Sequence, residues 1–254
     1  MAGADSDRQR AQVLGVPVDL MDRRGVEERL RSCLATPGLR HIVTLNPEQI
    51  MAARTDHDLR DLLAATDLIT VDGIGLAVAL RIAGLKPVER VTGVQIVELL
   101  ARSGPPLFFL GGKSGAAEEA RHRLLASNSG AASGGAWSHG HSGPKDDQEA
   151  IDRITASGAQ AVLVAYGVPA QLTWIERNRT ALEDCGVRLA VGVGGALDYF
   201  AGMARRPPDV VNRIGLEWAW RLAHEPRRLA RQRVLPKFAI LAGREAIGRR
   251  LGRR

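Results

Sequence analysis

The stretch HIVTLNPEQIMAARTDHDLRDLLAATDLITVDGIG, residues 41–75, carries the pattern that sets the fold class. It begins with a short apolar run, His41–Leu45, continues through an amphipathic segment, Pro47–Ala65, and ends with a second apolar run, Leu68–Val71. Two short runs that flank one helical pattern are typical of a βαβ unit, in which both strands run in the same direction. The stretch therefore predicts two parallel strands joined by a helix.

The same alternation continues on both sides of this unit. Further strands are expected at Val13–Leu20, Leu107–Leu110, Ala159–Ala165 and Val187–Val193, and further helices at Val26–Ala35, Val94–Arg102, Gly115–Ala126, Asp146–Ala156 and Pro169–Glu183. Several strand segments are apolar throughout, as strands are when helices cover both faces of their sheet. The sequence thus predicts an α/β, Rossmann-like fold with a mostly parallel sheet and helices on both faces.

Two segments depart from this alternation. Residues 127–144 are rich in Gly and Ser and are expected to form a loop. After Phe200 the strands give way to helical patterns at Pro208–His224, Pro226–Val234 and Pro236–Leu251. We therefore divide the chain into an α/β core, residues 1–203, and a basic helical appendage, residues 204–254.

The composition favours a cytoplasmic protein. Hydrophobic residues make up 45% of the chain, which is enough for a packed core. The two cysteines, Cys33 and Cys185, form no CxxC pair, so a disulfide framework is not expected. Residues 1–10 lack the apolar segment of a secretory signal, and no apolar run is long enough to predict a transmembrane helix.

The positive charge is concentrated in the appendage. Residues 205–254 hold 14 Lys or Arg against four Asp or Glu, whereas the rest of the chain holds 21 against 24. Arg221, Arg228 and Arg231 recur at helical intervals beyond an apolar series of Ile214, Trp218 and Leu222. This combination favours a helix at the surface of an anionic membrane. The alternative is a helix that packs on the core with a solvated basic face; no nucleic-acid-binding motif is present.

Candidate site residues follow the expected strands, because ligands bind at the carboxyl ends of the strands in open parallel sheets. Thr44 and Asn46 lie two residues apart and share one direction as their strand ends. Asn46 is also a suitable N-cap for the helix that begins at Pro47. Asp72 follows the next strand beside two glycines, where it is either a general base or a turn aspartate bonded to local amides.

Three further turns offer backbone amides at the same edge. Gly111, Gly112 and Lys113 form a strand-to-helix turn suited to phosphate, although the spacing of a P-loop is missing. Gly167 and Gln171 open one helix, and Gly194 and Gly195 follow the last strand. Each of these turns is equally compatible with plain turn chemistry.

No metal site is expected. Asp56-His57-Asp58 has the DxD form that some sugar transferases use, but it lies in a charged helical stretch typical of a solvated face. His139 and His141 lack partners at ligand spacing.

Seven segments in fixed order resemble the WecG/TagA/CpsF glycosyltransferase family. They are TLNPEQI (44–50), DGIGL (72–76), ERVTGVQIVELL (89–100), FFLGGKSGAAEEA (108–120), GVPAQLTWIERNR (167–179), GVGGALDYFAGMARRPP (192–208) and GLEWAWRLAHEPRRLARQR (215–233). The resemblance implies an inverting enzyme that transfers a sugar, often N-acetylmannosamine, from a UDP-sugar to a polyprenyl-diphosphate-linked acceptor, without metal or other cofactor.

The resemblance also implies roles for individual residues. Asp72 is the expected catalytic base, and Thr44, Asn46 and Gln171 are expected in the active site. Arg221, Arg228 and Arg231 are expected to close over the site and meet the diphosphate. Leu172 stands where the family usually has an acidic residue, and Thr70-Val71 where Asn-Ala is common, so the sugar specificity is left open.

Other interpretations remain at this point. One is a non-catalytic, nucleotide-binding α/β module tethered to the membrane by its basic tail. A dehydrogenase is disfavoured, because no GxGxxG follows the first strand. The oligomeric state is left open, with a homo-oligomer among the alternatives.

Overall fold

The computed structural model describes residues 9–86, 88–127, 135–138, 144–204, 220 and 232–252. Apart from residues 220 and 232–234, the expected helices Pro208–His224 and Pro226–Val234 lie outside the described residues, as do the three arginines Arg221, Arg228 and Arg231. His139 and His141 also lie outside them.

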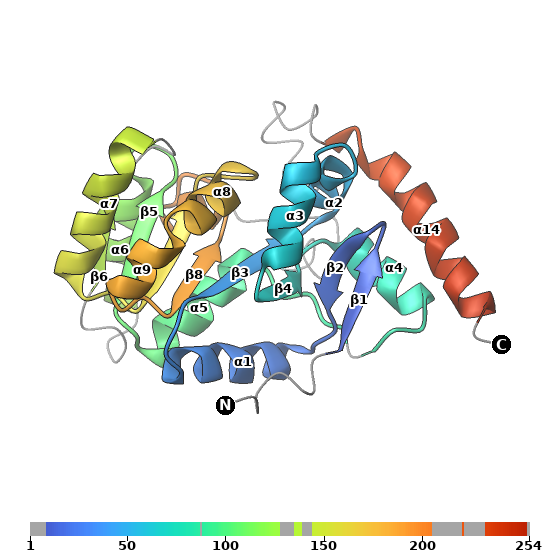
Figure 1. Ribbon diagram of the computed structural model, residues 1–254, viewed down its shortest axis with the longest axis horizontal. Helices are drawn as coiled ribbons and strands as arrows, with labels where there is room; N and C mark the ends of the chain where they lie inside the picture. Colours follow the sequence, from blue (N-terminus) through green and yellow to red (C-terminus); the bar gives the residue numbers. More distant parts are fainter. Residues whose placement is uncertain are drawn as a thin grey trace.

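A six-stranded, all-parallel sheet forms the centre of the molecule, in the order β4-β3-β8-β7-β5-β6 (Figure 1). Its strands are β3 Arg40–Leu45, β4 Leu68–Val71, β5 Leu107–Gly111, β6 Gly135–Ser138, β7 Ala161–Ala165 and β8 Leu189–Gly192. Strand β3 pairs with β4 on one side and with β8 on the other, so it joins the edge strand β4 to the rest of the sheet. The predicted α/β, Rossmann-like fold is confirmed.

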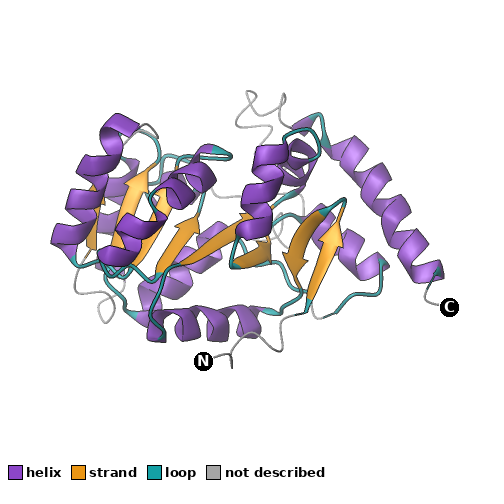
Figure 2. Ribbon diagram, viewed as in Figure 1, coloured by secondary structure: helices purple, strands orange, loops and turns teal. Residues whose placement is uncertain are grey.

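Helices cover both faces of this sheet (Figure 2). Alternate residues of each strand point to opposite faces, as Phe108 and Phe109 do in β5. One face packs on α1 Arg23–Ala35, α5 Gly93–Ser103, α6 Ala116–Ser127 and α10 Ala196–Phe200. The other face packs on α7 Pro144–Ser157, α8 Ala170–Arg177 and α9 Arg179–Asp184 over β5, β7 and β8, and on α2 Pro47–Ala53, α3 His57–Ala65 and α4 Ile74–Ile82 over β3 and β4.

The expected strand Val13–Leu20 is confirmed only in part, as β2 Val16–Asp19, and it does not join the parallel sheet. The segment is part of an antiparallel hairpin, β1 Arg10–Val13 and β2 Val16–Asp19, which forms a separate two-stranded sheet. The turn residues Leu14 and Gly15 both have positive φ, 52° and 83°. A two-residue turn with this backbone reverses the chain, although Leu-Gly lacks the Asn-Gly signature of such turns.

Two expected helices are each divided into two. Pro47–Ala65 becomes α2 and α3, and the side chain of Asp56 caps α3 by accepting a hydrogen bond from the Leu59 amide at 2.9 Å. The first aspartate of the Asp56-His57-Asp58 motif is thus a helix cap. Pro169–Glu183 becomes α8 and α9, which meet at Asn178.

Three elements were not expected. Helices α4 and α10 follow the Gly-rich turns after β4 and β8. Strand β6 lies within the Gly/Ser-rich segment expected to be a loop, and it pairs with β5 at the edge of the sheet. Main-chain pairing with an existing strand compensates for the low β-propensity of such a sequence.

The C-terminal helix α14 Leu235–Leu251 confirms the expected helix Pro236–Leu251. It packs against α4 and α2 and buries Phe238, Ala242 and Ala246. The carboxylate of Glu245 accepts a hydrogen bond of 2.7 Å from the Leu14 amide at the hairpin turn. No helix in the described part of the chain combines the length and apolar character needed to cross a bilayer.

Candidate active site

All ten of the described site candidates lie at or just beyond the carboxyl edge of the sheet. They follow or end the strands β3, β4, β5, β7 and β8: Thr44, Asn46, Asp72, Gly111, Gly112, Lys113, Gly167, Gln171, Gly194 and Gly195. Parallel strands bring these segments to one edge although they span about 150 residues of sequence.

Asp72 and Asn46 lie beside each other because the ends of β4 and β3 are in backbone contact. The Asp72 amide donates to the Leu45 carbonyl at 2.9 Å. A Cβ atom at Gly73 would lie 2.2 Å from Cδ of Pro47 and 3.5 Å from Cα of Asn46. Only glycine permits this approach. The Asp72 side chain is 29% exposed, so its carboxylate is accessible at the rim.

Arg90 is a site residue that the sequence did not reveal as one. Its Nε donates to the Asp72 carbonyl at 2.6 Å and lies 3.9 Å from Oδ1 of the Asp72 carboxylate. An isolated parallel bridge between Val71 and Arg90 brings this segment to the edge of β4. Arg90 therefore both braces the turn at Asp72 and places a cation beside its carboxylate.

Asn46 is the N-cap of α2, as one reading of the sequence predicted. Its Oδ1 accepts from the Gln49 amide, and the Gln49 side chain accepts from the Asn46 amide, both at 3.0 Å. This reciprocal capping fixes the Asn46 side chain through its oxygen. Its NH2 group has no hydrogen-bond partner among the described residues, so a donor remains for a ligand.

Thr44 lies where three elements meet. A Cβ atom at Gly93, the first residue of α5, would lie 3.6 Å from the Thr44 Oγ1 and 3.0 Å from the Val193 carbonyl. The N-terminus of α5 thus approaches the ends of β3 and β8, and its positive dipole end favours a negative group there.

Gln171 is buried and holds the turn after β8. Its Oε1 accepts from the Gly194 amide at 3.2 Å, and a Cβ atom at Gly192 would lie 2.5 Å from its Nε2. The amide side chain therefore packs directly on the bare backbone of β8. Gln171 joins the β7 and β8 edges of the site, and Gly167, with φ 76°, leads into its helix.

The turn after β5 differs from the expected phosphate cradle. The Lys113 amide donates to Oδ1 of Asp198 at 2.9 Å, and the Lys113 Nζ lies 3.9 Å from Oδ2. The Asp198 carboxylate already accepts a hydrogen bond from the Lys113 amide, and its negative charge would repel a phosphate. This contact therefore disfavours phosphate binding at that amide. Asp198, in α10, is a second residue that sequence reasoning missed as a site residue, although it lies within a quoted motif.

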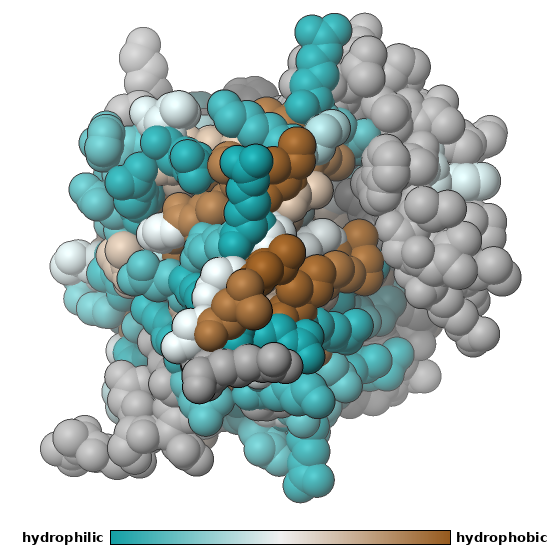
Figure 3. All heavy atoms as spheres, turned by 90° about the vertical axis from the view of Figure 1, so that its right-hand side faces the viewer, coloured by the Kyte–Doolittle hydropathy of each residue, from teal (hydrophilic) through white to brown (hydrophobic). Residues whose placement is uncertain are grey.

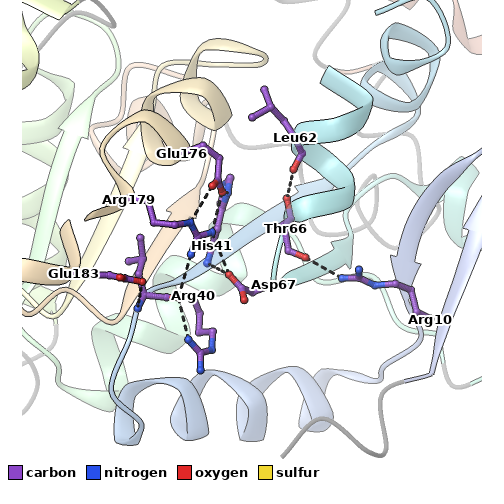
Figure 4. A network of polar contacts seen from close by, with 10 residues as sticks. Arg10, Arg40, His41, Leu62, Thr66, Asp67, Glu176, Arg179 and Glu183 are labelled. Atoms are coloured by element: carbon purple, nitrogen blue, oxygen red, sulfur yellow. Dashed lines mark hydrogen bonds and ion pairs between the residues drawn. The ribbon is translucent and has the colours of Figure 1, made fainter. Parts of the chain in front are cut away.

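A partly buried polar network fixes the other end of α8, at the amino edge of the sheet (Figure 4). The His41 amide donates to Asp67 at 2.8 Å, and its Nδ1 lies 2.7 Å from Oε1 of Glu176. Arg179 donates to both oxygens of Glu176. Burial opposes the charge of Glu176, but the hydrogen bonds from His41 and Arg179 outweigh it and lower its pKa to about 2. The network anchors the helix that carries Gln171.

The described residues contain no group of three or more side chains suited to a metal ion. The expectation of a metal-independent reaction stays a prediction, as do the roles assigned to each site residue.

The fold and this edge define an α/β protein that gathers polar side chains and glycine-rich turns at the carboxyl ends of a parallel sheet. A model of the glycosyl transferase WecG/TagA/CpsF family matches residues 11–252. The chain belongs to this family. Membership supports the activity of a glycosyltransferase in cell-surface polysaccharide synthesis. The family implies a sugar-nucleotide donor and a lipid-linked acceptor in general.

Proposed function

We propose that the chain is an inverting transferase that moves N-acetylmannosamine or a related sugar from its UDP donor to a polyprenyl-diphosphate-linked sugar. The observation that supports this proposal is the partly exposed carboxylate of Asp72 at the sheet edge, beside the cation of Arg90 and on the turn that adjoins the cap residue Asn46.

In the proposed reaction, Asp72 accepts the proton of the acceptor hydroxyl. The oxygen of that hydroxyl attacks the anomeric carbon of the donor sugar from the face opposite the diphosphate. The bond between this carbon and the diphosphate oxygen breaks, and UDP leaves with the bonding electrons. One displacement of this kind inverts the anomeric centre.

The remaining site residues position the two substrates. The NH2 group of Asn46, which has no partner among the described residues, and the Thr44 hydroxyl donate hydrogen bonds to the acceptor or to the sugar of the nucleotide donor. Negative charge develops on the leaving diphosphate, and preorganised donors stabilise such charge. The N-terminus of α5 supplies part of this stabilisation, and Arg221, Arg228 and Arg231 of the appendage supply the rest.

A lipid-linked acceptor requires the enzyme to work at a membrane. We propose that the chain is a peripheral protein at the inner face of the cell membrane, held there by its basic appendage. The lipid diphosphate of the acceptor would then lie close to the positive residues of that segment.

A screen of UDP-sugars against a short-chain prenyl-diphosphate-linked sugar, read by mass spectrometry, tests the proposal. The wild-type protein should give a product one sugar larger, and Asp72→Asn should reduce its formation by about a thousandfold or more. Asp58→Asn, in the exposed first turn of α3, is the matched control and should leave turnover unchanged. Unaltered turnover in Asp72→Asn would reject its role as the base. Donor binding without turnover by the wild-type protein would favour the non-catalytic, nucleotide-binding alternative.

A further inference from the structure

Three elements carry the cap, the expected base and the glutamine of the site, and each of them also carries a residue of the polar network at its opposite end. In each pair, the site residue and the network residue lie five positions apart in the sequence. The pairs are Asn46 and His41 along β3, Asp72 and Asp67 along β4, and Gln171 and Glu176 along α8. The site and the network are thus opposite ends of the same three elements.

His41 contacts both other elements directly. Its amide donates to Oδ2 of Asp67 at 2.8 Å, and its carbonyl accepts from the Asp67 amide at 3.0 Å. Its ring Nδ1 lies 2.7 Å from Oε1 of Glu176. Arg179 completes the connection, because its Nη2 donates to Glu176 at 2.9 Å and to Asp67 at 3.4 Å. One histidine and one arginine therefore join the amino ends of β3 and β4 to the last turn of α8 (Figure 4).

The burial of the histidine is unfavourable by itself. His41 is 0% exposed, and its Nε2 has no hydrogen-bond partner within the described part of the chain. A buried polar atom without a partner costs free energy, and an apolar side chain at this position would avoid that cost. Because the pKa of Glu176 is about 2, its carboxylate is ionised at neutral pH, and Nδ1 is the ring nitrogen that donates to it. This donated bond is the property that an apolar side chain lacks.

We propose that His41 is a positioning residue: it fixes the tilt of α8 relative to β3 and β4 and thereby aligns Gln171, Asn46 and Asp72 at the opposite edge. Five residues of strand span about 16 Å, so a tilt of about 4° at the network moves the far end by about 1 Å. A displacement of this size at a catalytic group lowers the rate about a hundredfold. The effect on catalysis rests on the proposed function, whereas the positioning does not.

Two backbone amides at the site report the alignment without any substrate. The Gly194 amide donates to Gln171 at 3.2 Å, and the Asp72 amide donates to the Leu45 carbonyl at 2.9 Å. Hydrogen exchange at both amides, followed by NMR, should be at least about fivefold faster in His41→Leu, because α8 and β4 lose their common anchor. In His41→Asn the side-chain Nδ2 replaces the ring Nδ1 as donor, so exchange should return to within about twofold of wild type.

Transfer from a UDP-sugar to a short-chain, water-soluble acceptor measures the catalytic consequence. In His41→Leu, kcat should fall about tenfold to a hundredfold while KM for the UDP-sugar stays within about threefold, because the variant loses alignment of the reacting groups. His41→Asn should restore kcat to within about threefold of wild type.

Two control variants separate positioning from general effects of substitution. Ile154→Val removes one buried methyl group under α7, so it lowers stability without touching the network, and it should keep both kcat and the exchange at the two amides. Figure 3 shows the end of the molecule that α4 and α14 form, where apolar side chains gather on the surface. Val78→Ala, at a position of α4 that is 44% exposed, changes this surface and should also behave as wild type.

Three results would overturn the proposal. They are exchange or kcat in His41→Leu equal to that of the wild type, an asparagine variant as impaired as the leucine variant, and an equal impairment in Ile154→Val. If His41→Leu does not fold, Arg179→Gln tests the same connection from its partly exposed side. Exchange at the Gly194 amide should then be about threefold faster, and unchanged exchange would reject the connection. Absence of transfer in the wild type, together with the expected exchange in the variants, would reject the proposed function and leave the positioning intact.

Discussion

Replacing Gly73 by alanine tests whether the contact between the ends of β3 and β4 sets the geometry at Asp72. Gly73 has φ −81°, so alanine adopts its backbone without strain. The new methyl group would, however, lie 2.2 Å from Cδ and 3.1 Å from Cγ of Pro47. Pro47 is a buried ring at the start of α2 and cannot rotate away.

The size of the effect follows from this distance. Ordinary contact begins near 3.4 Å, so the turn that carries Asp72 and the start of α2 must separate by more than an ångström. Overpacking of this kind costs about 1–3 kcal/mol, and the smaller entropy of the unfolded alanine chain offsets about 0.5–1 kcal/mol. We expect a net loss of about 1–2 kcal/mol. A displacement of about 1 Å at a catalytic group lowers the rate about a hundredfold.

Urea unfolding and kcat/KM with a water-soluble acceptor measure both effects. Gly243→Ala is the matched control, because a Cβ atom there meets nothing within 4 Å. This control variant should be more stable to unfolding by about 0.5–1 kcal/mol, because alanine replaces glycine within the helix α14, and it should keep its activity. If Gly73→Ala keeps activity within threefold of wild type while losing stability as expected, then the spacing between the two strand ends does not govern the reaction.

Two further substitutions separate structural from functional roles. Asn46→Ala should lower the free energy of unfolding by about 1 kcal/mol, whereas Asn46→Asp keeps the cap oxygen and should stay near wild type; full turnover by the aspartate variant would make Asn46 a cap only. Glu176→Gln should be less stable than wild type by on the order of 2 kcal/mol at pH 7. Because the folded state lowers the pKa of Glu176 from 4.5 to about 2, this difference should shrink as the pH falls through that interval. Urea titrations at several pH values measure it, and a difference independent of pH would contradict the assigned hydrogen bonds.

The sequence predicted the parallel sheet well because its signal is local. Strands such as β4 and β5 are short runs that are apolar throughout, because helices cover both faces of the sheet. The predicted strand at residues 68–71 agrees with β4 at both boundaries. The division of two expected helices was not predicted, because whether a residue caps a helix depends on the backbone conformation at that residue. Asp56 has the same sequence neighbours whether it caps α3 or lies on the surface of one long helix.

The missed hairpin and strand depend on tertiary contacts. Leu14 takes a positive φ that leucine disfavours on its own, and the hydrogen bond from its amide to Glu245 of α14 helps to hold it there. Strand β6 forms from Gly135–Ser138 because β5 offers it an edge. Neither partner is visible in the local sequence, since 231 residues separate Leu14 from Glu245.

The candidate site divides in the same way. Residues that directly follow a strand, such as Thr44 and Asp72, were predicted at the edge because a parallel sheet determines where strand ends lie. Arg90 and Asp198 reach the edge from a loop and from a short helix, and their positions depend on side-chain contacts. The same contacts modify the predicted roles, since Asp198 occupies the Lys113 amide that was assigned to phosphate.

The place of strand β3 between β4 and β8 explains why so few residues hold the site together. It ends beside β4 and β8 at once, so Thr44 and Asn46 lie between the Asp72 turn and the Gln171–Gly194 contact. Its amino end carries His41 in the network that fixes α8. A shift of β3 along its axis would therefore move the cap, the base and the glutamine relative to one another. The contacts that stabilise β3 therefore also align the site, so substitutions of the glycines at the strand ends should lower both stability and activity.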